Sequence, residues 1–335
     1  MKNTVSKLLF TAVFALCSSP ALWAESWRIH NDLSKGAHFA SLNEAMDTIA
    51  VVDGDTLYLD PGCLLTADQT ITKAVTVIGT GWGFTNKPYA PASLSGKLLI
   101  KNAAKVVGVG IANNVTLYSS NVTLEGCNAQ EVGVSEDNIQ NVDIIGCVIW
   151  KEIVGKATTS HWNIYNSYII NEGTYGGHTI NNVHQSMIVN CVIVSRVDNK
   201  YCISTNNSTI KNNIIVNTRG SFVDYIVSGS NNVIYNNCLS AKNTSAYAAT
   251  NVCEGTATLT HFVKGLGDGT LVEGSPAKGA GEGGIDCGIY AEGSLYPFIR
   301  YGLPEHVPHF TEAVIPTQPT DGKVKVTLKI ENQNR

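Results

Sequence analysis

Residues 122–129 read Val-Thr-Leu-Glu-Gly-Cys-Asn-Ala, and five later segments align with them over eight residues without a gap. Those five segments are residues 142–149, 162–169, 186–193, 208–215 and 232–239. The sixth residue of each unit falls at position 127, 147, 167, 191, 213 or 237, so successive units lie 20 to 24 residues apart. Self-similarity at such a period is typical of a solenoid.

Two positions of the repeat carry most of its structural information. The third residue is aliphatic in every unit, as expected for an inward side chain on a short strand: Leu124, Ile144, Ile164, Ile188, Ile210 and Ile234. The fifth residue is glycine or asparagine: Gly126, Gly146, Asn166, Asn190, Asn212 and Asn236. Both residue types tolerate positive φ, so we expect a sharp turn at this place in every coil. Stacked asparagines in that turn can also hydrogen-bond to one another as a ladder.

The repeat predicts an all-β fold, a single-stranded parallel β-helix. Units of 20 to 24 residues leave no room for helix pairs, and the fixed leucines of leucine-rich repeats are missing. Residues 75–82 and 98–104 fit the same register less well and extend the array, which gives about eight or more coils. Eight coils spaced at about 4.8 Å form a rod roughly 40 Å long. Ser41 and Glu44 form a capping-box pattern, which predicts a short N-terminal capping helix.

Several of these segments resemble the right-handed parallel β-helix of the pectate lyase-like superfamily. They are the asparagine-bearing turn, residues 41–62 at the N-terminal side, and the closing segments 271–281 and 285–290. The resemblance covers roughly residues 26–303 and implies right-handed coils, with the asparagine turn joining the second and third strands. It also implies that a substrate lies across the sheet of first strands, framed by the turns that follow the third strands. The superfamily includes lyases, hydrolases, epimerases, phage spikes and adhesins, so the chemistry stays open.

The ends of the chain differ in character from the repeat. Residues 1–24 have the pattern of a secretory signal peptide, with Lys2 and Lys7 before an apolar run and Ala24 before the expected cleavage point. We therefore expect an exported protein, periplasmic, extracellular or attached to the cell surface. The β-helix domain is expected over residues 25–303, and residues 304–335 form a tail in which residues 323–330 alternate like a strand. No later stretch is long and apolar enough to predict a transmembrane segment.

The net charge of the chain limits the classes of partner that we expect it to bind. Without Lys2 and Lys7 the chain has 21 basic and 27 acidic residues, a formal charge of −6. Nucleic acid is not expected as a partner, because binding it requires clustered basic residues. A polysaccharide or a surface glycan is the expected partner.

Charged and aromatic residues of the long turns and first strands are the candidate site. The turns are expected at residues 151–157, 171–178 and 195–200. Elimination from a uronate needs a base, for which we name Lys156, Lys200, Arg196 and, as the alternative, His178. It also needs a cation, and Glu152, Glu172 and Asp224 are candidate Ca²⁺ ligands. Hydrolysis would instead need a carboxylate pair, which the same acidic residues could supply. Substrate contacts are expected from Glu136, Asp137, Trp162 and Tyr175, although aromatic residues of this kind also fill cores.

Glu152, Glu172 and Arg196 all lie five residues after a register position, so we expect them to stack about 5 Å apart. Cys127, Cys147 and Cys191 share one register position and are expected to be small buried side chains. Cys253 and Cys287 are the more plausible disulfide pair.

Three functions remain compatible with the sequence. The first is a lyase or hydrolase of acidic polysaccharide. The second is a non-catalytic surface protein that binds glycan in the manner of an adhesin. The third is a structural spacer.

Overall fold

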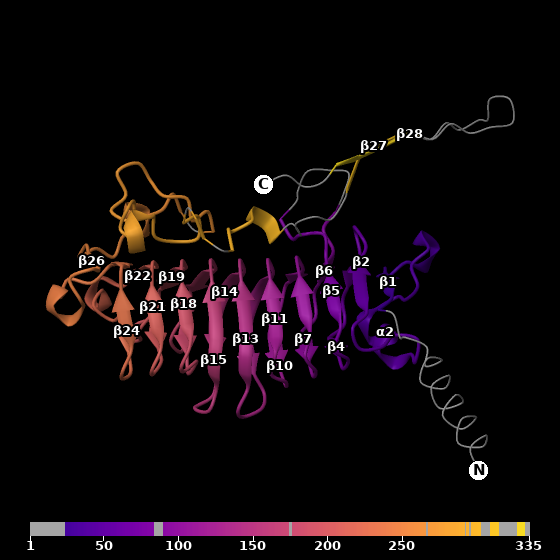
Figure 1. The fold of residues 1–335 in the computed structure, drawn as a ribbon, viewed down its shortest axis with the longest axis horizontal. Helices are drawn as coiled ribbons and strands as arrows, with labels where there is room; N and C mark the ends of the chain where they lie inside the picture. Colours follow the sequence, from indigo (N-terminus) through magenta and orange to yellow (C-terminus); the bar gives the residue numbers. More distant parts are fainter. Residues whose placement is uncertain are drawn as a thin grey trace, which may run out of the picture.

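The computed structural model describes residues 24–83, 90–173, 176–265, 267–291, 293–294, 296–302, 309–314 and 327–331. The chain winds into a parallel β-helix, in which the short strands of each coil pair with their equivalents in the next coil (Figure 1). The expected fold class is confirmed. The expected signal peptide lies outside the described residues except for Ala24. Among the helices that the structure describes, none is long and apolar enough to cross a membrane.

Face A is a ten-stranded parallel sheet that runs the length of the rod. In order along the sheet its strands are β1 (Ser26–Ile29), β2 (Thr56–Leu59), β5 (Thr76–Ile78), β8 (Lys105–Val107), β11 (Val122–Glu125), β13 (Gln140–Ile145), β15 (Ser160–Tyr165), β18 (Met187–Val189), β21 (Thr209–Lys211) and β24 (Val233–Tyr235).

Face B follows face A in each coil. Its strands are β3 (Leu64–Leu65), β6 (Ser93–Leu94), β9 (Gly110–Ile111), the first halves of β12 (Asn128–Val134) and β14 (Val148–Val154), then β16 (Tyr168–Asn171), β19 (Val192–Ser195), β22 (Ile214–Asn217), β25 (Cys238–Leu239) and β26 (Val252–Cys253).

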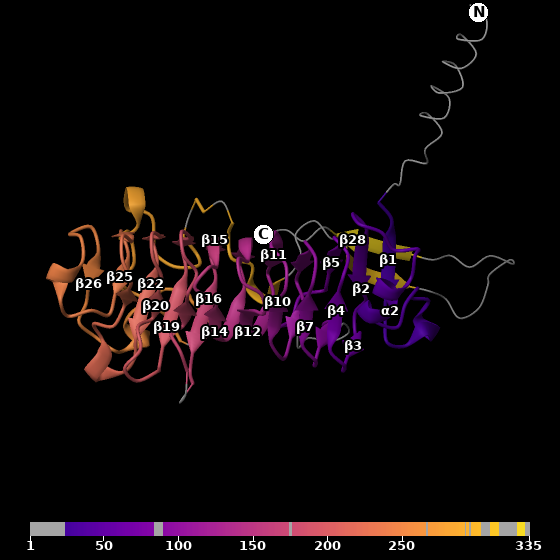
Figure 2. The ribbon, with the colours of Figure 1, turned by 90° about the horizontal axis from the view of Figure 1, so that it is seen from below.

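Face C closes each coil. Its strands are β4 (Gln69–Ile71), β7 (Leu98–Ile100), β10 (Val115–Leu117), the second halves of β12 and β14, then β17 (Ile180–Asn181), β20 (Ile203–Ser204) and β23 (Val227–Ser228). Because β12 and β14 continue around the corner between faces B and C, these two faces form one 16-stranded sheet (Figure 2). We call the connections of the three faces the AB, BC and CA turns.

The interior of the rod is a column of aliphatic side chains. Five of the six third-position residues are fully buried, and Ile234 in the last coil packs against the same core. The fifth-position residues all have positive φ, between 46° and 59°, which confirms the expected left-handed bend in the AB turn.

The hydrogen-bond ladder in the AB turn is formed by the sixth residues and not by the fifth. The N–H of Cys147 donates to Ser167 Oγ (3.1 Å), that of Cys191 to Asn213 Oδ1 (2.8 Å), and that of Asn213 to Asn237 Oδ1 (3.0 Å). The sixth residue points inward, where its side chain can satisfy the backbone of the coil before it. The fifth-position asparagines face outward.

A second asparagine turn, which the repeat alignment did not identify, lies in the CA turn. Asn121, Asn141, Asn207 and Asn231 have positive φ there. Asn141 Nδ2 donates to Asn121 Oδ1, and Asn231 Nδ2 donates to Asn207 Oδ1, both over 3.1 Å.

The described residues between 254 and 302, which we call the strap, return along the rod and cover the outer side of face B (Figure 1). The outward side chains of β16, β19 and β22 form a second apolar cluster with strap residues such as Phe262, Cys287 and Ile289. Outward asparagines of the AB turn hold the strap: Asn166 Nδ2 donates to Ile289 O (3.0 Å), and Glu282 N donates to Asn212 Oδ1 (2.9 Å). The segments expected to close the end of the rod therefore cover its side.

All eight cysteines of the described residues are free thiols, so the expected Cys253–Cys287 disulfide is wrong. Cys253 packs against the interior core, whereas Cys287 belongs to the outer cluster under the strap. The two side chains lie on opposite sides of face B. Cys127, Cys147 and Cys191 are buried as expected.

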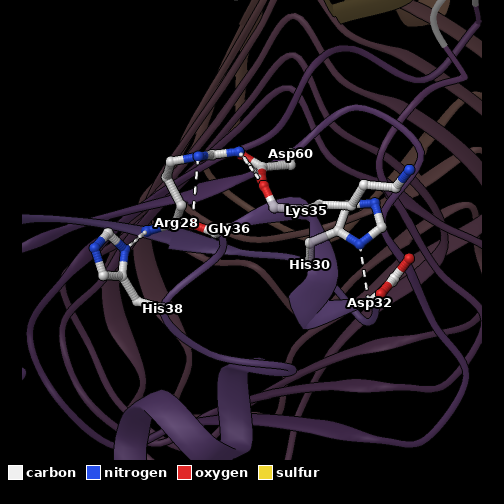
Figure 3. A network of polar contacts seen from close by, with 7 residues as sticks. All are labelled: Arg28, His30, Asp32, Lys35, Gly36, His38 and Asp60. Atoms are coloured by element: carbon white, nitrogen blue, oxygen red, sulfur yellow. Dashed lines mark hydrogen bonds and ion pairs between the residues drawn. The ribbon is translucent and has the colours of Figure 1, made fainter.

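A polar network closes the N-terminal end of the rod (Figure 3). Arg28 donates to both carboxylate oxygens of Asp60, over 3.1 and 2.7 Å, and this partner raises the pKa of the arginine. The N–H groups of Arg28 and Asp32 donate to Nδ1 of His38 and His30, respectively. These contacts fix the loop that leads into the capping helix.

The capping helix α2 (Leu42–Asp47) begins as the sequence predicts. Glu44 N donates to Ser41 Oγ (3.1 Å) as in a capping box, whereas the Glu44 carboxylate accepts from Ala40 N (2.7 Å), one residue before the N-cap. Short 3₁₀ helices occur at η1 (Leu33–Lys35), η2 (Gly220–Phe222), η3 (Thr244–Ala246), η4 (Leu259–His261), η5 (Glu282–Gly284) and η6 (Arg300–Gly302).

In the tail, β27 (His309–Val314) and β28 (Thr327–Glu331) pair antiparallel. The strand expected at residues 323–330 is thus present from Thr327, and its first four residues lie outside the described part.

Candidate functional site

The outward side of face C carries a strip of small or uncharged side chains. One outward residue from each coil forms this strip: Thr70, Leu99, Thr116, Gly133, Val154, Asn181, Ser204 and Ser228. Eight positions spaced at about 4.8 Å extend over roughly 34 Å. Charged residues border this strip on both edges, and aromatic residues border it on the edge of the BC turns.

Glu131, Lys151 and Glu152 lie where β12 and β14 bend from face B to face C. Lys151 Nζ is 2.9 Å from Glu131 Oε2 and 3.6 Å from Glu152 Oε1. A register shift after Ala129 brings Glu131 opposite Glu152. One lysine therefore joins two carboxylates that are neighbours in adjacent coils.

The environments of these two carboxylates differ. The side chain of Glu152 is 13% exposed and that of Glu131 is 21% exposed. Burial raises the pKa of Glu152, the charge of Lys151 opposes this shift, and the charge of Glu131 adds to it. The protonated form of Glu152 is therefore favoured relative to that of an exposed glutamic acid.

The next BC turn stands beside this pair. Glu152 Oε2 lies 3.3 Å from the point where a Cβ on Gly177 would be. His178 follows, and its Nδ1 is 3.1 Å from Tyr201 O. Burial and the nearby Lys200 charge lower the pKa of His178, so its imidazole is neutral near pH 7.

His178, Tyr201 and Tyr225 occupy equivalent positions, two residues before β17, β20 and β23. The rings of Tyr201 and Tyr225 stack with centroids 4.7 Å apart, and the His178 ring lies 6.2 Å from that of Tyr201. Because the two tyrosine rings stack, each covers one face of the other, and that face cannot stack on a sugar ring.

Of the residues expected to stack, only one pair does so. Glu172 lies opposite Arg196, and their ion pair is 2.9 Å long. Glu152 lies opposite Thr179 instead of Glu172, because β14 pairs with β16 before Glu172 and with β17 after Thr179. Residues 151–154, expected in a long turn, belong to β14.

The opposite edge of the strip carries Asp137 and Lys156 in the CA turns. Lys156 Nζ donates to Ser135 O (2.6 Å) and lies 3.5 Å from Asp137 Oδ1. Glu136 adjoins this pair in the chain. Lys200 lies in the BC turn 196–202 and forms no ion pair with any described residue.

Two of the predicted residues have structural roles. Trp162 is fully buried in the interior core, so it cannot contact a substrate. Asp224 accepts hydrogen bonds from Lys242 N (2.6 Å) and Asn243 N (2.8 Å) and so holds a turn. Tyr175 lies outside the described residues.

The expected calcium ligands are not brought together. Glu152 pairs with Lys151, Glu172 pairs with Arg196, and Asp224 binds backbone. In the part of the chain that the structure describes, no three His, Cys, Asp or Glu side chains converge as a metal site.

Glu131 is the residue that the sequence reasoning missed. Its position depends on the irregularity after Ala129, which shifts it into register with Glu152. An offset counted from the repeat cannot reveal such a shift.

No family model matches the chain, and neither a curated protein nor a solved structure matches it.

Proposed function

We propose that this protein is an exported β-helix of the pectate lyase-like type that binds a polysaccharide along face C. The observation that carries the proposal is the strip from Thr70 to Ser228, which is free of charged side chains and bordered by charged and aromatic ones. Its hydroxyl and amide groups, such as those of Asn181 and Ser204, suit the hydroxyl groups of sugars.

The length of the strip also supports a polymer as the ligand. About 34 Å of continuous surface exceeds what a single sugar ring requires and fits a chain of several rings. The tyrosine and histidine edges at its border add donors and acceptors along the same direction. Lys200, at this border, forms no ion pair with any described residue and is available to an acidic group of the polymer.

Binding can be tested by calorimetry and affinity electrophoresis with polygalacturonate, alginate, arabinoxylan and galactomannan. Ser204→Trp places a large side chain in the strip and should weaken binding at least tenfold. Thr209→Trp makes the same change at an outward position of face A and serves as the control. The proposal fails if no polymer binds, or if both variants weaken binding equally.

A further inference from the structure

We infer that Glu131 and Glu152 form a nucleophile–acid pair that hydrolyses a glycosidic bond with retention of configuration. This inference rests on the proposed function, since the pair lies at the edge of the strip that would hold the polymer. Its reaction class, hydrolysis by two carboxyl groups, differs from the lysine- or arginine-based elimination that the sequence suggested.

The spacing of the pair supports a retaining enzyme. Lys151 Nζ lies 2.9 Å from a Glu131 oxygen and 3.6 Å from a Glu152 oxygen. Because one nitrogen lies at these distances from both oxygens, the two oxygens are less than roughly 6.5 Å apart unless the three atoms are collinear. Inverting enzymes hold their carboxyl groups at least roughly 6.5 Å apart. Retaining enzymes hold their carboxyl groups about 5 to 5.5 Å apart.

The surroundings divide the two roles. Glu152 is the more buried carboxyl group and lies next to a like charge, which favours its protonated form. Glu131 is the more exposed of the two and has the shorter ion pair with Lys151, 2.9 Å against 3.6 Å. Two carboxyl groups in unequal environments are the arrangement that separates an acid from a nucleophile.

Both carboxylates border bare backbone, where a sugar ring can approach. Glu131 Oε1 lies 3.3 Å from the point where a Cβ on Gly133 would be, and Gly133 is part of the strip. Glu152 Oε2 likewise lies 3.3 Å from the point where a Cβ on Gly177 would be.

The adjoining turn also holds an unsatisfied donor. Asn171 is fully buried, and its Nδ2 has no hydrogen-bond partner in the described part of the chain. This amide nitrogen lies 3.0 Å from the point where a Cβ on Gly176 would be. Gly176 precedes Gly177, the glycine that borders Glu152. A buried donor without a protein partner suits an ordered water molecule in this turn.

The reaction balances with water as the only co-reactant. The carboxyl group of Glu152 protonates the glycosidic oxygen, the bond between C1 and that oxygen breaks, and a Glu131 oxygen bonds to C1. Water then attacks C1 and gives its proton to the Glu152 carboxylate, while the ester bond to Glu131 breaks. The products are a new reducing end and a free alcohol, and both carboxyl groups return to their starting forms.

The test combines binding, turnover and stereochemistry in the full chain. Reducing ends are measured with the four polymers named above for wild type, Glu131→Gln, Glu152→Gln and the control Glu125→Gln. Glu125 is a glutamate of the same coil that pairs with Lys105 on face A, away from the strip. We expect a loss of roughly 10²- to 10⁴-fold in turnover for the two site variants and no loss for the control.

Two readouts separate catalysis from structural damage. Azide added to Glu131→Ala should yield a glycosyl azide of inverted configuration, and proton NMR of the wild-type reaction should show the retained anomer first. Polymer binding by both glutamine variants should equal that of wild type.

The outcomes distinguish the two proposals. Binding without reducing ends, unsaturated products, or full activity in both variants would overturn the catalytic pair and leave the binding proposal intact. Absence of binding to any polymer would overturn the proposed function itself.

Discussion

Faces B and C belong to one sheet, yet their outward residues differ completely. Where the strap covers face B, from β16 to β22, these residues are apolar and fully buried, for example Ile170, Val192 and Ile214. On face C they are uncharged, mostly small or polar, and partly exposed, for example Asn181 and Ser204. The inward residues of both faces are alike. The polarity of the outward residues thus matches their surroundings. They are apolar where the strap packs on face B and mostly polar where face C meets solvent.

The largest expected effect comes from placing a charge on each face. Ile214→Asp puts a carboxylate under the strap and should lower the free energy of unfolding by about 4 kcal/mol or more, because the charge is buried without a partner. Ser204→Asp on face C should change it by less than about 0.5 kcal/mol. Urea unfolding of both variants checks the comparison, and equal losses would contradict it.

Detaching the far end of the strap should have the next largest effect. Gly302 has a φ of 62°, and a Cβ there would lie 1.7 Å from Gly126 O. Gly302→Ala should destabilise the fold by about 2 to 3 kcal/mol, since backbone must move. Gly220→Ala, where no atom lies within 4 Å, is the matched control. A thermal melt in which Gly302→Ala loses no more than the control would show that the strap end is not held there.

The interior ladder lies in the AB turn, beneath neither outward surface, and its loss should show an intermediate effect. Asn213 accepts from Cys191 N and donates to Ile188 O and Asn237 Oδ1. Asn213→Ala leaves buried backbone groups unpaired and should cost about 2 kcal/mol in chemical denaturation. Asn163→Ala, on the outward side of face A, should cost less than about 0.5 kcal/mol. Similar losses for the two asparagines would refute a special role of the ladder.

The smallest effect should appear at the corner between the two faces. Burial raises the pKa of Glu152, so the folded chain holds this proton more tightly than the unfolded chain does. Below the unfolded pKa, both states are protonated, and wild type loses stability as pH rises through the folded pKa. Gln cannot ionise. The stability of Glu152→Gln relative to wild type should therefore increase between about pH 4 and pH 7, by roughly 0.5 kcal/mol or less.

Denaturation curves of both proteins at several pH values measure this difference. If the relative stability of the variant decreased with rising pH, the assigned direction of the pKa shift would be wrong.

The coils could be predicted because their signal is local and repeated. An aliphatic third residue and a glycine or asparagine fifth residue, as in Ile188 and Asn190, depend only on one strand and one turn. The capping box at Ser41 is equally local. Features of this kind recur at one period, so each coil supports the interpretation of the next.

The strap and the corner could not be predicted in the same way. The outward apolar residues of face B look like inward residues of another strand until the covering segment is known. Glu131 and Glu152 meet through a shift in register, and Glu152 and Glu172 separate through an inserted turn. Both depend on how neighbouring coils align, which the repeat period does not encode.

The strap joins residues far apart in the chain, and this has a consequence for the order of assembly. Coils pair with their immediate neighbours, so they can form one after another as the chain lengthens. Asn166 meets Ile289 at a separation of 123 residues, and Gly126 meets Gly302 at a still greater one. Such distant pairings form late in folding. A chain that has not yet been extended through the strap therefore leaves the apolar outward residues of face B exposed. These residues are covered only after the strap has been synthesised and has packed on the coils that formed before it.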